Sequence, residues 1–246
     1  MRAMVLAAGL GTRLRPLTDD RPKALVAIDG RSLLEIALAR LRSFGIHDVI
    51  VNVHHFADKV VDYLKHHDDF GMNLAISRED VLLDTGGGLK KASQFFLHGD
   101  KDEPFVVYNV DVLSSIDLAS MVKAHRRRDA LATLAVQHRD SSRLLLFDEE
   151  SLLCGRQTRG GAPEIVRLAG KTQALAFCGI HVVSPRIFAL MNETGIFPIV
   201  PVYLRLSGEG ERIVGFPADE YYWRDLGKPE SLEQAARDLR QKIIEQ

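Results

Sequence analysis

The residues best suited to chemistry begin near the start of the chain. An apolar run, Ala3-Met4-Val5-Leu6-Ala7-Ala8, leads into Gly9-Leu10-Gly11-Thr12-Arg13, and Lys23 follows shortly afterwards. Glycines let backbone N–H groups come close to a ligand, and such groups bind phosphate oxygens. Arg13 and Lys23 add positive charge, so the segment is suited to binding a polyphosphate. A bare Gly-x-Gly would instead favour a tight turn with solvated basic side chains.

Two aspartates could supply the opposite charge. Asp111 follows a fully apolar predicted strand over residues 105–108, and Asp225 lies in Trp223-Arg224-Asp225-Leu226-Gly227-Lys228-Pro229-Glu230. Two carboxylates from distant segments that converge on phosphates suit a hard cation such as Mg²⁺, with water as the remaining ligands. For either aspartate alone, a turn or a helix N-cap is the simpler interpretation.

A third motif, Asp84-Thr85-Gly86-Gly87-Gly88, precedes a predicted helix. A permissive turn alone would be enough to explain three glycines before a helix.

The first segment matches neither common phosphate-binding motif. No Gly-x-x-x-x-Gly-Lys-Ser/Thr string is present, and Leu14 stands where a dinucleotide fingerprint needs its third glycine. The segment resembles the signature of the sugar-1-phosphate nucleotidylyltransferases, Leu-Ala-Ala-Gly-x-Gly-Thr-Arg-Leu-x-Pro-Leu-Thr followed by Pro-Lys-x-Leu. Residues 6–18 and 22–25 match it position by position. The resemblance implies transfer of a nucleotidyl group from a nucleoside triphosphate to a sugar 1-phosphate, with release of pyrophosphate.

The resemblance also implies roles for individual residues. Arg13 would bind the leaving pyrophosphate, Lys23 would neutralise the reacting phosphates, and Asp111 and Asp225 would hold Mg²⁺. Val110 replaces the glycine that the family usually has before the first aspartate. The residues expected to bind the nucleotide, with the two glycines of the third motif packed against the base, are Leu6, Ala7, Ala8, Gly9, Gly11, Thr12, Arg13, Asn52, Asp84, Thr85, Gly86 and Gly87.

On the sugar side the match is weaker. Gly179, in Phe177-Cys178-Gly179-Ile180-His181, would allow the sugar ring to come close, and Asn109 would contact the sugar. Many relatives have a Glu-Lys pair before that strand. The nearest counterpart here is Glu164, which is followed by Ile165 instead of lysine.

Several substrates fit the motifs. The Thr-Gly-Gly-Gly form and Asn52 resemble the N-acetylmuramate 1-phosphate uridylyltransferases, which favours UTP with an N-acetylated sugar. The alternatives are GTP with mannose or heptose 1-phosphate, CTP with phosphocholine, and a catalytically silent regulatory subunit that binds nucleotide-sugar. A glycosyltransferase would share the fold type but typically lacks the Gly-x-Gly-Thr-Arg loop.

Strand and helix patterns alternate through the first half of the chain, which predicts βαβ units and a mostly parallel sheet. We expect strands over residues 4–8, 49–53, 74–77, 105–108 and 130–136, and helices over residues 33–44, 56–64, 89–96 and 118–125. In such sheets ligands bind beyond the carboxyl ends of the strands.

The second half has a different pattern. It predicts a hairpin over residues 144–153, a flexible loop over 154–163, strands over 164–168 and 174–183, and a closing helix over 229–244. The fold class is therefore α/β: a Rossmann-like, mixed, mostly parallel sheet flanked by helices. The family architecture adds a small antiparallel lid on the sugar side, and we expect no left-handed β-helix. We predict a single domain, 1–246, with a nucleotide-binding half to about residue 128 and a sugar-side half from about 129.

Composition excludes other classes. The 246 residues are 46% hydrophobic and carry a net charge of −1, so no basic field attracts nucleic acid. Cys154 and Cys178 are too few and too widely spaced for a disulfide framework, which predicts a reducing cytoplasm. No apolar segment approaches the roughly 20 residues that span a bilayer. We expect a monomer or homo-oligomer with no nucleic-acid or membrane partner.

Overall fold

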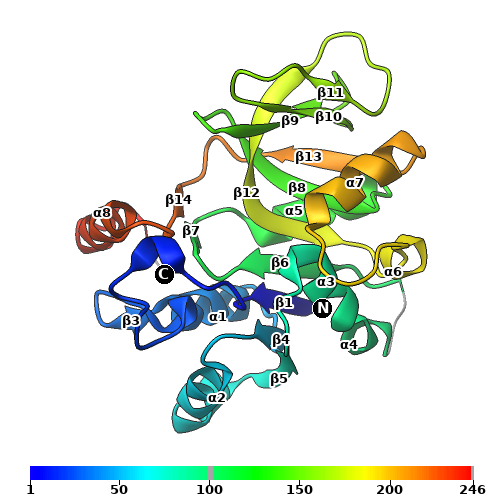
Figure 1. Cartoon of the computed structure of the whole chain (residues 1–246). Coiled ribbons are helices and arrows are strands. Elements are labelled where there is room, and N and C mark those ends of the chain that lie inside the picture. Colours follow the sequence, from blue (N-terminus) through cyan, green and yellow to red (C-terminus); the bar gives the residue numbers. More distant parts are fainter. Residues whose placement is uncertain (99–101, 245–246) are drawn as a thin grey trace.

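The computed structural model describes residues 1–98 and 102–244. Its centre is a ten-stranded mixed sheet with the order β11-β10-β9-β12-β6-β1-β4-β5, from which β8 and β13 branch at β12 (Figure 1). The strands of this sheet are β1 Arg2–Leu6, β4 Asp48–Val53, β5 Asn73–Arg78, β6 Phe105–Asn109, β8 Ala132–Gln137, β9 Arg143–Phe147, β10 Leu153–Thr158, β11 Glu164–Ile165, β12 Gln173–Val183 and β13 Ile213–Pro217.

The first half of the chain forms the parallel part of the sheet. Strand β1 pairs in parallel with β4 on one side and β6 on the other, and β5 extends the sheet beyond β4. The predicted parallel sheet is therefore confirmed, and the carboxyl ends of four strands lie at one edge.

The antiparallel lid is also confirmed. Strand β12 pairs antiparallel with β6, β8 and β9, and β10 and β11 follow beyond β9. Because the long strand β12 runs through both regions, the lid continues the central sheet instead of forming a separate one. In Figure 1 strands β9, β10 and β11 lie above the parallel strands.

The flexible loop predicted over residues 154–163 is wrong for its first part, which forms β10. The strand was not predicted because residues 154–163 are rich in glycine and arginine, which is more typical of a loop. A Cβ on Gly155 would lie 2.2 Å from the carbonyl oxygen of Glu164, so glycine is what lets β11 pair closely with β10.

Helices cover both faces of the sheet because successive strand residues point to opposite sides. Ala3 and Val5 belong to one buried apolar cluster, while Met4 between them belongs to the other. The first cluster packs against α1 Leu33–Ser43, α2 Ala57–His66, α5 Leu118–Arg127 and α8 Pro229–Arg240. The second packs against α3 Asp84–Lys91, α4 Ser93–Leu97, α6 Ile187–Leu190 and α7 Ile199–Gly208.

The helix predicted over residues 89–96 is two helices in the structure. Helix α3 begins at Asp84, so the three glycines lie inside it, and α4 follows after Ala92. Helices α6 and α7 and strand β13 occupy a region for which the sequence pattern predicted no elements.

Short elements complete the site-bearing edge. They are the 3₁₀ turns η1 Thr12–Leu14, η2 Lys23–Leu25 and η3 Asp68–Gly71, the hairpin of β2 Ala27–Ile28 with β3 Arg31–Ser32, and the pair β7 Val112–Ser114 with β14 Trp223–Asp225. Through β14 and α8 the chain returns to the first half, where Arg240 Nε lies 3.1 Å from Asp29 Oδ1.

Among the described residues, no helix has the length and apolar character needed to cross a bilayer.

Candidate active site

A cavity of about 360 Å³ opens at the carboxyl ends of the parallel strands. The strand register places Leu6 of β1 opposite Asn52 of β4 and Asn109 of β6, so the three strands end together. The volume is in the range typical of small-molecule sites. The cavity is lined by Leu6, Ala7, Ala8, Gly9, Lys23, Asn52, Leu82, Asp84, Thr85, Asn109, Val110, Asp111 and Ile196.

The glycine loop folds back over the segment that carries Lys23. Gly11 has a φ of 66°, and a Cβ there would lie 3.0 Å from Lys23 Cβ, so both conformation and space require glycine. The hydroxyl of Thr18 donates a hydrogen bond to the Gly11 carbonyl at 2.9 Å and closes the loop. Gly9, by contrast, borders the cavity, and a Cβ there would meet nothing within 4 Å.

Lys23 and Asp111 form an ion pair in the cavity wall. Lys23 is only 9% exposed, and the η2 turn after Pro22 holds its backbone in place. A lysine and an aspartate that meet in a cavity offer both a cation for phosphate oxygens and a carboxylate for a metal ion.

The pairing of β14 with β7 brings Asp225 beside Asp111. The backbone N–H of Leu226 donates to the Asp111 carbonyl at 2.8 Å, and the N–H of Gly227 donates to Asp225 Oδ1 at 2.9 Å. Arg13 reaches the same place, because a Cβ on Gly227 would lie 2.5 Å from its Nη2 atom. The Arg13 guanidinium makes no ion pair or hydrogen bond within the described residues, so its donors are available to a ligand.

A buried hydrogen-bond network through Glu79, which the sequence pattern did not predict, connects the start of the glycine loop to the backbone before α3. Asn52 Oδ1 accepts a hydrogen bond from Ala7 N at 2.7 Å, and its Nδ2 donates to Glu79 Oε1 at 2.7 Å. Glu79 Oε2 accepts from Leu83 N at 2.9 Å, and this glutamate is only 4% exposed. A Cβ on Gly88 would lie 2.6 Å from Glu79 Oε1, so the third glycine of the motif leaves room for the carboxylate. The only sequence signal was an acidic residue shortly after a predicted strand.

The other two glycines of that motif pack against the protein. A Cβ on Gly86 would lie 2.5 Å from the Phe197 ring, and one on Gly87 would lie 2.6 Å from the Gly195 carbonyl oxygen. The motif reaches the cavity through Asp84 and Thr85, and neither glycine is among its lining residues. The glycines are thus explained by close packing of α3 on the 195–197 segment.

On the opposite side, Gly179 meets Asn109. Gly179 has a φ of 73°, and a Cβ there would lie 2.7 Å from Asn109 Nδ2. Trp223 Nε1 donates to the neighbouring Cys178 carbonyl at 2.7 Å, which ties β12 to β14. Glu164 lies elsewhere: it is on β11 at the edge of the lid, its carboxylate is 2.6 Å from Arg156 Nε, and it is not among the cavity-lining residues. Glu164 therefore does not line this cavity, and its contact with the sugar stays a prediction.

Comparisons with known proteins identify the family of this chain. Residues 2–144 match the family described as Nucleotidyl transferase. The chain is also 37% identical over 238 residues to the N-acetylmuramate alpha-1-phosphate uridylyltransferase of Caulobacter vibrioides, with 93% of each chain covered. The chain belongs to the nucleotidyl transferase family.

Other relatives of this nucleotidyl transferase have different names. It is 27% identical over 237 residues to a mannose-1-phosphate guanyltransferase of Yarrowia lipolytica, of which it spans 62%, while 94% of its own length is covered. A solved structure of a UDP-glucose pyrophosphorylase complexed with UDP-glucose has a TM-score of 0.78 at 20% identity, covering 98% of both chains. That likeness establishes the shared fold.

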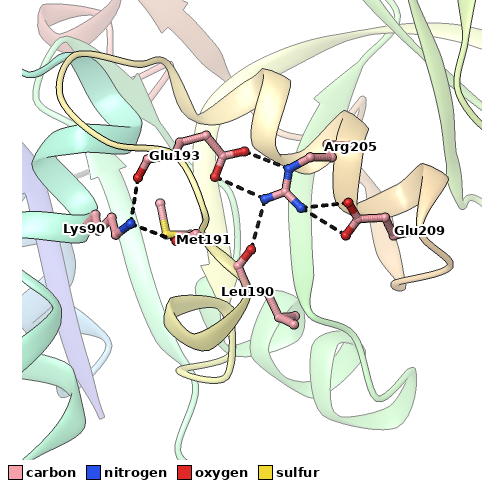
Figure 2. Close-up of polar contacts among 6 residues, drawn as sticks. All are labelled: Lys90, Leu190, Met191, Glu193, Arg205 and Glu209. Atoms are coloured by element: carbon pink, nitrogen blue, oxygen red, sulfur yellow. Dashed lines mark hydrogen bonds and ion pairs between the residues drawn. The ribbon is translucent and has the colours of Figure 1, made fainter.

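Ile196, a cavity residue that the sequence analysis did not identify, is held by the segment over residues 190–198. Figure 2 shows its anchors: Lys90 Nζ donates to the carbonyls of Met191 and Glu193 at 2.8 and 2.6 Å, and Arg205 Nε and Nη2 bind the Glu193 carboxylate at 2.8 and 3.1 Å. The hydrogen bond to Arg205 lowers the pKa of Glu193. In this nucleotidyl transferase, helices α3 and α7 thus jointly position one apolar wall of the cavity.

Proposed function

We propose that the enzyme transfers a uridylyl group from UTP to N-acetylmuramate 1-phosphate, releasing pyrophosphate and forming the UDP-sugar. The observation that carries the proposal is the meeting of the glycine loop, Lys23 and Asp111 in one cavity, with Arg13 and Asp225 beside it. The activity named for the Caulobacter relative supports the choice of base and sugar.

In this reaction a phosphate oxygen of the sugar 1-phosphate attacks the α-phosphorus of UTP. The new P–O bond forms as the bond to the bridging oxygen of pyrophosphate breaks, and pyrophosphate leaves with the electron pair. Such transfer depends on positioning and on neutralising charge more than on covalent catalysis. Lys23 would neutralise the α-phosphate and the attacking phosphate. Arg13, whose planar guanidinium suits bidentate contacts, would bind the pyrophosphate.

The donor set fits a magnesium ion. Asp111 and Asp225 would hold it, and among the described residues no group of three or more His, Cys, Asp or Glu side chains forms a fuller metal site. Magnesium is commonly bound by one or two carboxylates together with substrate phosphates and water. When bound, the ion would supply positive charge to the phosphate oxygens of UTP.

A second candidate is GTP with mannose or heptose 1-phosphate; the activity named for the Yarrowia relative supports mannose. The location in a reducing cytoplasm, the single-domain organisation and the oligomeric state also stay predictions.

The test is pyrophosphate release with Mg²⁺ across four nucleoside triphosphates and a panel of sugar 1-phosphates plus phosphocholine. We expect release with UTP and N-acetylmuramate 1-phosphate, and its loss in Asp111→Asn and Asp225→Asn proteins that melt like the wild type. Release only with GTP and mannose or heptose 1-phosphate would support the second candidate. Nucleotide binding without release in any combination would support a regulatory subunit.

A further inference from the structure

Arg139 is a positioned cation without a counter-charge. It follows β8 and is half-buried, with its Cζ 3.9 Å from the centre of the Trp223 ring and its Nη2 donating to the Phe177 carbonyl at 2.8 Å. Its Nε is buried and has no hydrogen-bond partner. Within the described residues no carboxylate pairs with it.

Two arginines of the lid, Arg156 and Arg159, are paired with carboxylates. Arg156 Nε lies 2.6 Å from Glu164 Oε2, and Arg159 pairs with Asp140. Both pairs are more exposed to solvent than Arg139. Water would compensate an unpaired charge at their positions more fully than at Arg139. A guanidinium held by an indole ring and a carbonyl, yet left without an anion, is prepared to bind one.

The contacts of Arg139 place it beside the sugar side of the site. Trp223 lies in β14 two residues before Asp225, and its indole N–H donates to the Cys178 carbonyl. Gly179, the next residue, packs against Asn109, which lines the cavity. Arg139 is therefore connected to the site through β12 and β14, on the lid side of Asn109.

This position argues against a contact with the reacting phosphates. The sugar 1-phosphate must meet the α-phosphate of the nucleotide near Lys23 and Asp111, which form an ion pair in the cavity wall. A sugar ring that extends from there past Asn109 and Gly179 would bring its other substituents toward Arg139. A substituent that suits a half-buried guanidinium is a carboxylate.

We propose that Arg139 binds a carboxylate carried by the sugar ring, away from the 1-phosphate, and so selects acidic sugar 1-phosphates over neutral ones. The inference rests on the proposed function. It narrows the substrate class, because N-acetylmuramate carries such a carboxylate in its lactyl ether and N-acetylglucosamine is the same sugar without it.

The test compares these two sugars as 1-phosphates with saturating UTP, in the wild type and in Arg139→Gln. Loss of a charge-assisted contact to the carboxylate raises the KM for N-acetylmuramate 1-phosphate by about 10- to 100-fold. The kcat, and the KM for N-acetylglucosamine 1-phosphate, change less than about twofold because the phosphate contacts are intact. Arg139→Lys keeps the charge without the fork and recovers part of the loss. The matched control is Arg143→Gln, which replaces an exposed arginine at the start of β9. It leaves the KM values for both sugar 1-phosphates unchanged.

Other results overturn the proposal. Equal rises in KM for both sugars mean that Arg139 binds the 1-phosphate or only supports Trp223, and equal kcat/KM of the wild type for both sugars means that no carboxylate is selected. Calorimetric binding of the two sugar phosphates to the same proteins repeats the comparison without turnover. If the wild type releases no pyrophosphate, the proposed function fails, whereas the Arg139 proposal fails when calorimetry shows no preference for the acidic sugar.

Discussion

Replacing Glu79 with glutamine tests the buried network directly. The Glu79 carboxylate accepts one hydrogen bond from Asn52 Nδ2 and one from Leu83 N. Glutamine keeps one acceptor and replaces the other with an NH₂ group, so one donor must face another donor in either amide orientation. Asn52 has no alternative orientation, because its Oδ1 already accepts from Ala7 N.

The size of the effect follows from that count. A hydrogen bond to a charged group contributes about 1.5–3 kcal/mol, so we expect Glu79→Gln to lower the free energy of unfolding by about 2 kcal/mol. For a chain of 246 residues this corresponds to a fall in Tm of about 4–8 °C. The KM for UTP should rise as well, because the network holds Ala7 and the backbone before Asp84.

The assay is thermal unfolding at pH 7.5 with Asp80→Asn as the matched control. Asp80 is the next residue and is exposed, so its replacement should leave the Tm within about 1 °C of the wild type. If the Glu79→Gln protein has the same Tm as the control, the stability does not depend on both carboxylate oxygens of Glu79.

The remaining predictions concern packing, pH and the segment over residues 190–198. Gly87→Ala should lower the free energy of unfolding in urea by about 1–3 kcal/mol, because its Cβ meets a backbone oxygen, whereas Gly9→Ala should not; equal stability of the two would contradict the packing role. Burial lowers the pKa of His125 to about 4 and of His181 to about 3. As the pH falls below 6.5, the ordinary pKa of histidine, these side chains therefore bind protons in the unfolded chain but stay neutral in the folded chain. Each histidine should therefore reduce stability by about 2 kcal/mol between pH 7 and pH 5, and a flat urea midpoint over that range would count against it. Arg205→Gln should lower the Tm by about 2–4 °C and raise the KM for UTP, and an unchanged KM would show that Ile196 does not depend on this anchor.

The parts of the site that were predictable are those governed by local pattern. The apolar runs before Ala7, Asn52 and Asn109 identify buried parallel strands, and parallel strands end at a common edge of a sheet. The lining residues at these three positions follow directly from that rule, as does the placement of Asp111 just beyond β6.

The parts that were not predictable depend on contacts between distant segments. Glycine disfavours helices, so the pattern placed Gly86 and Gly87 before the helix, yet close packing against the 195–197 segment outweighs that preference. Burial of Glu79 depends on Asn52, which no local periodicity reveals. The position of Glu164 depends on the pairing of β11 with β10 at the outer edge of the lid, which local pattern does not reveal.

The pairing of β7 with β14 also has a consequence for how the molecule comes into being. A ribosome delivers the glycine loop and Lys23 first, Asp111 much later, and Asp225 only near the end of the described chain. The nascent polypeptide can complete the nucleotide-facing strands long before the second aspartate exists. Closing such a long loop is also slower than forming local turns. We therefore expect assembly of the two carboxylates to be a late event in folding, because a chain that has not yet reached β14 lacks Asp225.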